Sequence, residues 1–126
     1  MKRDRDYILI AEDEPSMHRL LAYKLEGEGF KVDVATDGVT ALDKLKENNY
    51  GAVILDLMLP QLDGMQVLKK LKEAEIKIPV LILSAKSQEQ DILAGLDGGA
   101  EEYISKPFRP AELIARLNKV LEKNYA

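Results

Sequence analysis

The stretch that decides the fold is residues 52–60, Ala-Val-Ile-Leu-Asp-Leu-Met-Leu-Pro, an apolar run with one carboxylate in its middle. A charge inside such a run is costly to bury unless it is paired or bound to a metal ion. An aspartate at the end of a strand can also simply begin a loop. The residues after the other predicted strands favour the first interpretation, in which Asp56 is the centre of a functional site.

Two further unbroken apolar runs, at residues 7–11 and 80–83, have the same pattern. Runs of this length are typical of strands in a parallel sheet that is covered on both faces. The alternating residues 31–35 predict a half-exposed edge strand, and the short segment 103–105 predicts the opposite edge. The sequence therefore predicts five strands, with the strand before Asp56 near the middle.

Helical patterns separate these strands and follow the last one. Apolar residues recur at helical spacing from Pro15 to about Leu25, and over residues 38–47, 64–74, 89–96 and 110–121. Strands that alternate with helices through short loops form a three-layer α/β sandwich with right-handed crossovers. We therefore predict a flavodoxin-like (βα)5 fold whose parallel sheet has the strand order 2-1-3-4-5.

Length and composition predict one domain over residues 1–126, with residues 1–6 as a short charged extension. Hydrophobic residues make up 46% of the chain and charged residues 32%, as in ordinary globular proteins. The absence of cysteine removes disulfides and thiolate metal sites, and favours a cytoplasmic location. A net charge of −4 argues against direct binding of nucleic acid, and the apolar runs are too short to span a membrane.

Polar residues stand directly after four of the predicted strands. Glu12 and Asp13 follow the first strand, Asp56 the third, Ser84 the fourth and Lys106 the fifth. Each has an ordinary explanation when taken alone, as an acidic helix start, a cap or a surface lysine. In this fold, however, the functional crevice lies beyond the carboxyl ends of the strands, next to strands 1 and 3. We therefore expect all five residues to meet there.

Three carboxylates in one crevice would repel one another unless a cation joined them. Oxygen-only ligands without histidine or thiolate favour Mg²⁺, or Mn²⁺, over zinc. Such an ion would neutralise a phosphoryl group that arrives at Asp56, the remaining nucleophile. Lys106 and Ser84 would then contact the oxygens of the transferred group.

Together these residues resemble the receiver domain of two-component response regulators. The resemblance covers nearly the whole chain, through segments 8–14, 55–60, 63–64, 83–85 and 106–108 in that order. It implies that Asp56 is the phosphoacceptor, that Glu12 and Asp13 are the acidic pair of the metal site, and that Met58 offers its backbone carbonyl to the ion. It also implies a sensor histidine kinase as the phosphoryl donor, and a switch rather than a turnover enzyme.

The resemblance further implies a conformational change on phosphorylation. In the family, the hydroxyl residue, here Ser84, moves toward the phosphoryl group. An aromatic residue three positions before the lysine, here Tyr103, rotates inward into the space that is left. The bond between Lys106 and Pro107 is cis in the family.

Residues 99–113 are most similar to receivers of the OmpR/PhoB winged-helix class, which dimerise through their fourth helix, fifth strand and fifth helix. Four charged residues match positions of that surface: Glu102, Glu112, Arg116 and Lys123. Ile92 stands where a basic partner for Glu112 is usual, so one salt bridge is missing and Ile92 is expected to be an exposed apolar contact. We expect either a stand-alone receiver or a fragment of a DNA-binding regulator.

Three alternatives to a phosphorylation switch remain at this point. A metal-dependent phosphatase with an aspartate nucleophile usually needs a second acid two residues later, where this chain has Met58. A flavodoxin-like cofactor binder would need a hydroxyl-rich or glycine-rich loop after the first strand, where residues 12–14 are acidic. A pseudo-receiver that acts only by docking would bind no metal and take up no phosphoryl group.

Overall fold

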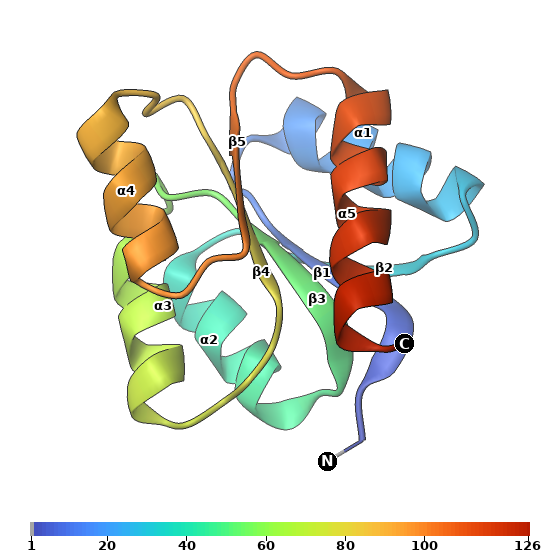
Figure 1. Cartoon of the computed structure of the whole chain (residues 1–126), viewed down its shortest axis with the longest axis horizontal. Coiled ribbons are helices and arrows are strands. Elements are labelled where there is room, and N and C mark those ends of the chain that lie inside the picture. Colours follow the sequence, from blue (N-terminus) through green and yellow to red (C-terminus); the bar gives the residue numbers. More distant parts are fainter. Residues whose placement is uncertain (1) are drawn as a thin grey trace.

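The computed structural model describes residues 2–126 as one parallel sheet of five strands between two layers of helices (Figure 1). The strands are β1 (Asp4–Ala11), β2 (Lys31–Ala35), β3 (Tyr50–Leu55), β4 (Val80–Ser84) and β5 (Glu102–Ser105). The helices are α1 (Pro15–Gly27), α2 (Gly38–Glu47), α3 (Gly64–Glu73), α4 (Glu89–Asp97) and α5 (Pro110–Asn124). The strand order is β2-β1-β3-β4-β5, so the predicted flavodoxin-like (βα)5 fold is confirmed.

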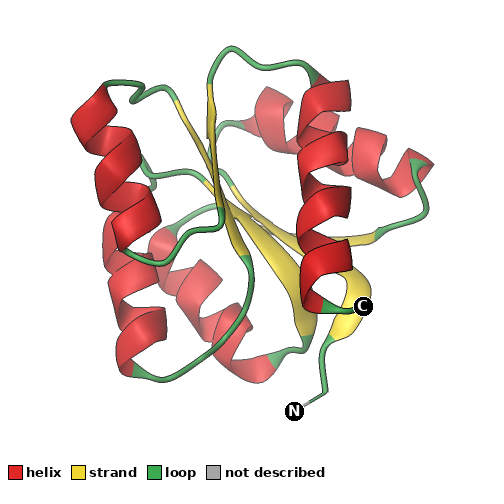
Figure 2. Ribbon diagram, in the orientation of Figure 1, coloured by secondary structure: helices red, strands yellow, loops and turns green. Residues whose placement is uncertain are grey.

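The helices divide unequally between the two faces of the sheet. Helices α1 and α5 cover one face, and α2, α3 and α4 cover the other, as the red helices on either side of the yellow strands show (Figure 2). Each face has its own hydrophobic cluster because successive residues of a strand point to opposite sides. All residues of β3 are buried, as expected for a strand covered on both faces.

The N-terminal boundary differs from the prediction. Strand β1 begins at Asp4, so residues 4–6 of the predicted extension belong to the sheet. The backbone N–H of Asp4 donates to the carbonyl of Asn49 (2.7 Å), and its carboxylate forms an ion pair with Lys31. These residues are charged and stand at the open end of the sheet, so they carry no apolar signal. Within residues 2–126, no helix has the length and apolar character that crossing a membrane requires.

The edge strand β2 is held by a polar contact beneath α2. Tyr50 of β3 is fully buried, and its hydroxyl donates to the carboxylate of Asp33, which also accepts from the Lys44 ammonium at 3.0 Å. Burial raises the pKa of the Asp33 carboxyl, but the hydrogen bonds from Tyr50 and Lys44 outweigh it and hold that pKa below its usual 3.8. Asp33 is therefore ionised at neutral pH and stabilises the fold.

The substitution Tyr50→Phe is expected to lower the free energy of unfolding by about 2 kcal/mol at neutral pH, because it removes a hydrogen bond to a charged group. A carboxyl with a lowered pKa stabilises the fold above its unfolded pKa and loses this effect as the pH falls through its folded pKa. The difference between variant and wild type should therefore shrink below about pH 4. Urea unfolding at several pH values measures this, with Tyr23→Phe as the control because Tyr23 is 74% exposed. A pH-independent difference would contradict the assignment to Asp33.

Candidate functional site

Backbone hydrogen bonds hold the polar residues that follow the strands. The N–H of Glu12 donates to the carbonyl of Ala35 (3.0 Å), and the N–H of Asp56 donates to the carbonyl of Ala11 (3.0 Å). The N–H of Lys106 donates to the carbonyl of Ser84 (2.8 Å). These residues therefore continue the pairing of the sheet, and their side chains meet at its carboxyl edge.

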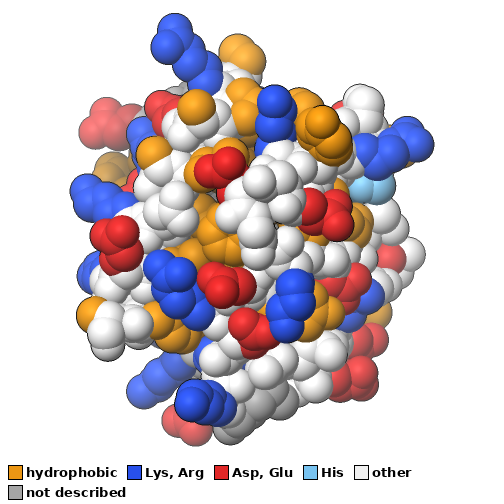
Figure 3. All heavy atoms as spheres, turned by 90° about the vertical axis from the view of Figure 1, so that its right-hand side faces the viewer, with side chains coloured by type: hydrophobic (Ala, Val, Ile, Leu, Met, Phe, Trp, Pro, Cys, Tyr) orange, Lys and Arg blue, Asp and Glu red, His pale blue; other side chains and the backbone are white. Residues whose placement is uncertain are grey.

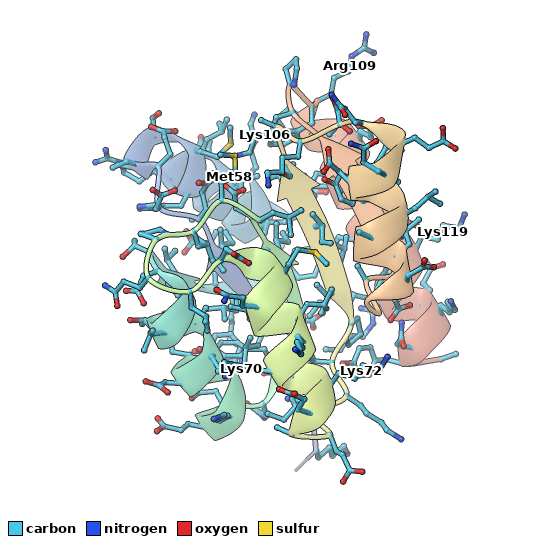
Figure 4. All side chains as sticks on the ribbon, turned by 90° about the vertical axis from the view of Figure 1, so that its left-hand side faces the viewer. Met58, Lys70, Lys72, Lys106, Arg109 and Lys119 are labelled. Carbon is cyan, nitrogen blue, oxygen red and sulfur yellow. The ribbon has the colours of Figure 1, made fainter. Side chains whose placement is uncertain are left out.

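Lys106 lies between two buried carboxylates. Its ammonium is 2.6 Å from Oε1 of Glu12 and 3.1 Å from Oδ2 of Asp56. The side chains of Glu12 and Asp56 are only 2% and 7% exposed, against 20% for Lys106. Figure 4 shows Lys106 and Met58 together at this end of the molecule.

The backbone around Asp56 fixes the orientation of its carboxylate. Oδ1 of Asp56 accepts a hydrogen bond from the N–H of Met58 (3.0 Å), while Oδ2 faces Lys106. The side chain of Met58 is 58% exposed and takes no part in this contact. Both oxygens of Asp56 thus have a donor, and the carboxylate has a defined position at the edge of the crevice.

Burial shifts the pKa values of Glu12 and Lys106 in opposite directions. Burial raises the pKa of the Glu12 carboxyl above its usual range, despite the hydrogen bond from Lys106. Burial lowers the pKa of the Lys106 ammonium, but its hydrogen bonds to Glu12 and Asp56 outweigh this and raise that pKa overall. Lys106 is therefore charged at neutral pH, and it is the cation that makes the burial of these carboxylates tolerable.

Glu12, Asp13 and Asp56 form the one group of three potential metal ligands found within residues 2–126. Their ligand oxygens all lie within 4.8 Å of one another, and Asp13 is exposed to solvent. Lys106 contacts two of these carboxylates, so the group keeps an excess of negative charge. An all-oxygen set that is open to water on one side fits a hard divalent cation such as Mg²⁺.

Ser84 and Tyr103 are joined through the backbone of Lys86. Ser84 is fully buried, and its Oγ accepts from the N–H of Lys86 (3.1 Å). The hydroxyl of Tyr103 donates to the carbonyl of Lys86, so the ring points inward and is only 8% exposed. Burial raises the pKa of this hydroxyl, so it remains a donor at neutral pH. Sequence reasoning missed this connection because a backbone contact leaves no side-chain pattern.

The chain matches the model of the response regulator receiver domain over residues 8–118. It belongs to that family. The match includes every residue of the crevice described above.

Curated relatives and solved structures agree with this assignment. The chain is 42% identical to the alkaline phosphatase synthesis transcriptional regulatory protein PhoP of Bacillus subtilis over 117 residues, which are 93% of this chain and 49% of that protein. It is 42% identical to the transcriptional regulatory protein SrrA of Staphylococcus aureus over 116 residues, 92% of this chain and 48% of that one. These transcriptional regulators confirm the resemblance to the OmpR/PhoB class. The chain spans about half the length of the curated relatives it matches.

Among solved structures, the receiver domain of the Francisella response regulator 1452 superposes with a TM-score of 0.91 at 36% identity, covering 94% of this chain and 98% of that one. The receiver domain of sensor histidine kinase PA1611 from Pseudomonas aeruginosa superposes with a TM-score of 0.86 at 28% identity, covering 94% and 99%. That structure has a magnesium ion coordinated in its active site cleft.

In this receiver domain the charged residues of the predicted dimer surface pair within the chain. Arg116 is 2.9 Å from Glu102 and 3.7 Å from Glu112, and Lys123 is 3.6 Å from Glu101. The expectation that Ile92 is an exposed contact is wrong, because Ile92 is half-buried against the hydrophobic cluster of its face. The bond between Lys106 and Pro107 is cis, as the resemblance implies.

Proposed function

We propose that this receiver domain is a switch that takes a phosphoryl group from the phosphohistidine of a sensor histidine kinase onto Asp56. The observation that most supports this proposal is the position of the Asp56 carboxylate: it is buried, 3.1 Å from the Lys106 ammonium, and grouped with Glu12 and Asp13. A carboxylate that is fixed at both oxygens and lies beside an ammonium group suits the attack on a phosphoryl group.

In the transfer, a carboxylate oxygen of Asp56 forms the new bond to phosphorus while the bond between phosphorus and the donor histidine nitrogen breaks. The imidazole leaves with the electron pair. Glu12, Asp13, Asp56 and the backbone carbonyl of Met58 would hold Mg²⁺, and a bound ion would supply positive charge to the phosphoryl oxygens. Lys106, which already contacts Oδ2 of Asp56, supplies a second positive charge.

The signal is proposed to leave the site through Ser84 and Tyr103. In this structure the Ser84 hydroxyl accepts a hydrogen bond from the N–H of Lys86. When the hydroxyl donates to a phosphoryl oxygen, it moves relative to that N–H. The Lys86 carbonyl in turn holds the hydroxyl of Tyr103, so a shift of this loop reaches β5 and α4. The affected surface is the face formed by α4, β5 and α5.

A second copy of this chain is the proposed partner of that face. Leu93 and Leu96 of α4 are 52% and 41% exposed, and α5 and β5 contribute Arg116 and the two glutamates with which it pairs. Exposed apolar residues beside charged ones are typical of such interfaces. The apolar contact that Ile92 was expected to supply would then come from these leucines.

The kinase is proposed to approach the side of the molecule on which α1 and α5 lie next to each other. A shallow groove of about 460 Å³ runs between them and includes Lys24, Pro110 and Ile114. Figure 3 shows this face, on which hydrophobic side chains lie among acidic and basic ones. Such a mixed surface suits a transient protein complex.

The alternative functions have less support from the site. A phosphatase would need an acid at position 58, but the Met58 side chain can neither give nor take a proton. A cofactor phosphate would meet Glu12 and Asp13 in the loop after β1. A pseudo-receiver, in contrast, would take up no phosphoryl group at Asp56.

The prediction is one phosphoryl adduct on the native chain after incubation with acetyl phosphate and Mg²⁺, detected by intact-mass spectrometry. Asp56→Asn should abolish the adduct, because an amide is a poor nucleophile and cannot form the acyl phosphate. Chelation of Mg²⁺ should abolish it as well. Asp43→Asn is the matched control, since Asp43 is exposed on α2 and should leave the adduct unchanged. An adduct that persists in Asp56→Asn would overturn the proposal.

A further inference from the structure

Helix α4 rests on the sheet through a glycine. Gly95 is the only buried residue of α4; Ile92 is half-buried, and Leu93 and Leu96 are exposed. Beneath Gly95 lie Ile82 of β4 and Tyr103 of β5, which are directly paired across these two strands. Figure 1 shows α4 running alongside β5, which is the edge strand of the sheet.

Position 95 has no room for a side chain between α4 and the residues Ile82 and Tyr103. A Cβ atom at position 95 would stand 2.7 Å from Cδ1 of Ile82, and 2.9 Å and 3.1 Å from two ring carbons of Tyr103. Ile82 is fully buried and has little room to turn. The ring of Tyr103 is rigid, but it belongs to an edge strand, so it can swing out toward solvent. The buried ring and the present position of α4 therefore coexist only because residue 95 has no side chain.

We infer that Gly95 is a positioning residue of the switch: it lets α4 close over Tyr103 and so keeps the ring in its buried orientation. Gly95 acts through Tyr103, whose hydroxyl holds the carbonyl of Lys86, whose N–H in turn donates to Ser84. This inference rests on the proposed function, because it concerns the path by which the site and α4 affect each other. A partner that pulls α4 away would free the ring, and a ring that leaves would loosen α4.

The test is the substitution Gly95→Ala in the full chain labelled with 3-fluorotyrosine, observed by ¹⁹F NMR without phosphorylation. The Tyr103 signal is assigned by its loss in Tyr103→Phe. The change of each fluorine signal between H₂O and D₂O reports exposure, with Tyr23 (74% exposed) and Tyr50 (fully buried) as internal references. In the wild type, Tyr103 should respond like Tyr50. In Gly95→Ala it should respond like Tyr23.

Gly98→Ala is the matched control. It adds the same methyl group at the end of the same helix, but its Cβ would meet Cδ2 of Leu68 at 2.9 Å and no tyrosine. The Tyr103 signal should stay buried in this variant. If Tyr103 remains buried in Gly95→Ala as it does in Gly98→Ala, the inference is wrong.

A double-mutant cycle keeps the inference testable if Gly95→Ala folds poorly. The loss of stability caused by Gly95→Ala should be clearly smaller in the Tyr103→Ala background, because the overlap with the ring is gone and only the overlap with Ile82 remains. An equal loss in both backgrounds would also overturn the inference. Intact-mass spectrometry on the same samples keeps the two proposals apart: a wild type without an Asp56 adduct refutes the proposed function, whereas the Tyr103 signal decides the role of Gly95.

Discussion

Replacing Gly38 by alanine is expected to lower the free energy of unfolding by more than about 4 kcal/mol, an effect that few single substitutions reach. A Cβ atom at position 38 would stand 1.7 Å from the carbonyl oxygen of Leu62 and 2.6 Å from its carbonyl carbon. Both are backbone atoms, so no rotamer change relieves the overlap. Helix α2 and the loop after Asp56 would have to separate. Urea unfolding followed by circular dichroism measures the loss.

This contact is close because α2 begins on the loop that carries Asp56. The carbonyl of Pro60 accepts from the N–H of Gly38 (3.2 Å) and from the N–H of Leu62 (2.8 Å). Gln61, which lies between Pro60 and Leu62, has a φ of 68°, a value that few residues other than glycine adopt. A displaced α2 would therefore disturb the loop beside the phosphoacceptor as well as the fold.

Gly27→Ala is the control for this prediction. Gly27 ends α1, and a Cβ atom there would meet nothing within 4 Å. Alanine is a better helix former than glycine, so this variant should be as stable as the wild type or more stable by up to about 1 kcal/mol. Equal losses in Gly27→Ala and Gly38→Ala would show that the close approach of α2 is not the cause.

Neither Gly38 nor Gly95 could be singled out from the sequence alone, and the reason is physical. Apolar periodicity predicted the ten elements and the parallel sheet, because it reports which faces of a strand or helix are buried. A glycine at a helix contact has no side chain and adds nothing to that periodicity. The charged residues 4–6 were missed for a related reason: they extend β1 only through backbone hydrogen bonds and an ion pair at the open end of the sheet.

The sequence predicted which residues meet at the candidate site, but not which side-chain contacts they form there. Topology brings the ends of β1, β3, β4 and β5 to one edge, so the meeting of Glu12, Asp56 and Lys106 follows from strand order. Strand order does not determine that Lys106 lies closer to Glu12 than to Asp56. That choice depends on side-chain rotamers and on which donors the neighbouring backbone supplies.

Lys106→Met is expected to lower the free energy of unfolding by about 3 kcal/mol in magnesium-free buffer. The variant leaves Glu12 and Asp56 buried without a cation, which is costly, while methionine keeps most of the side-chain volume. This loss of stability is at the lower end of the range observed when one partner of a buried ion pair is removed. The reason is that the Glu12 or Asp56 carboxyl can take up a proton instead of remaining charged. Lys119→Met, at an exposed position on α5 (Figure 4), should change stability by less than about 0.5 kcal/mol.

Addition of Mg²⁺ should then stabilise Lys106→Met more than it stabilises the wild type. In the wild type, the Lys106 ammonium already neutralises part of the charge of Glu12 and Asp56 and repels a second cation. In the variant, Mg²⁺ meets the full charge, so its affinity and hence its effect on unfolding should rise. Equal Mg²⁺ effects in the two proteins would mean that Lys106 and the ion do not share these carboxylates. A loss without magnesium that matches Lys119→Met would mean that the lysine is not what stabilises the buried charges.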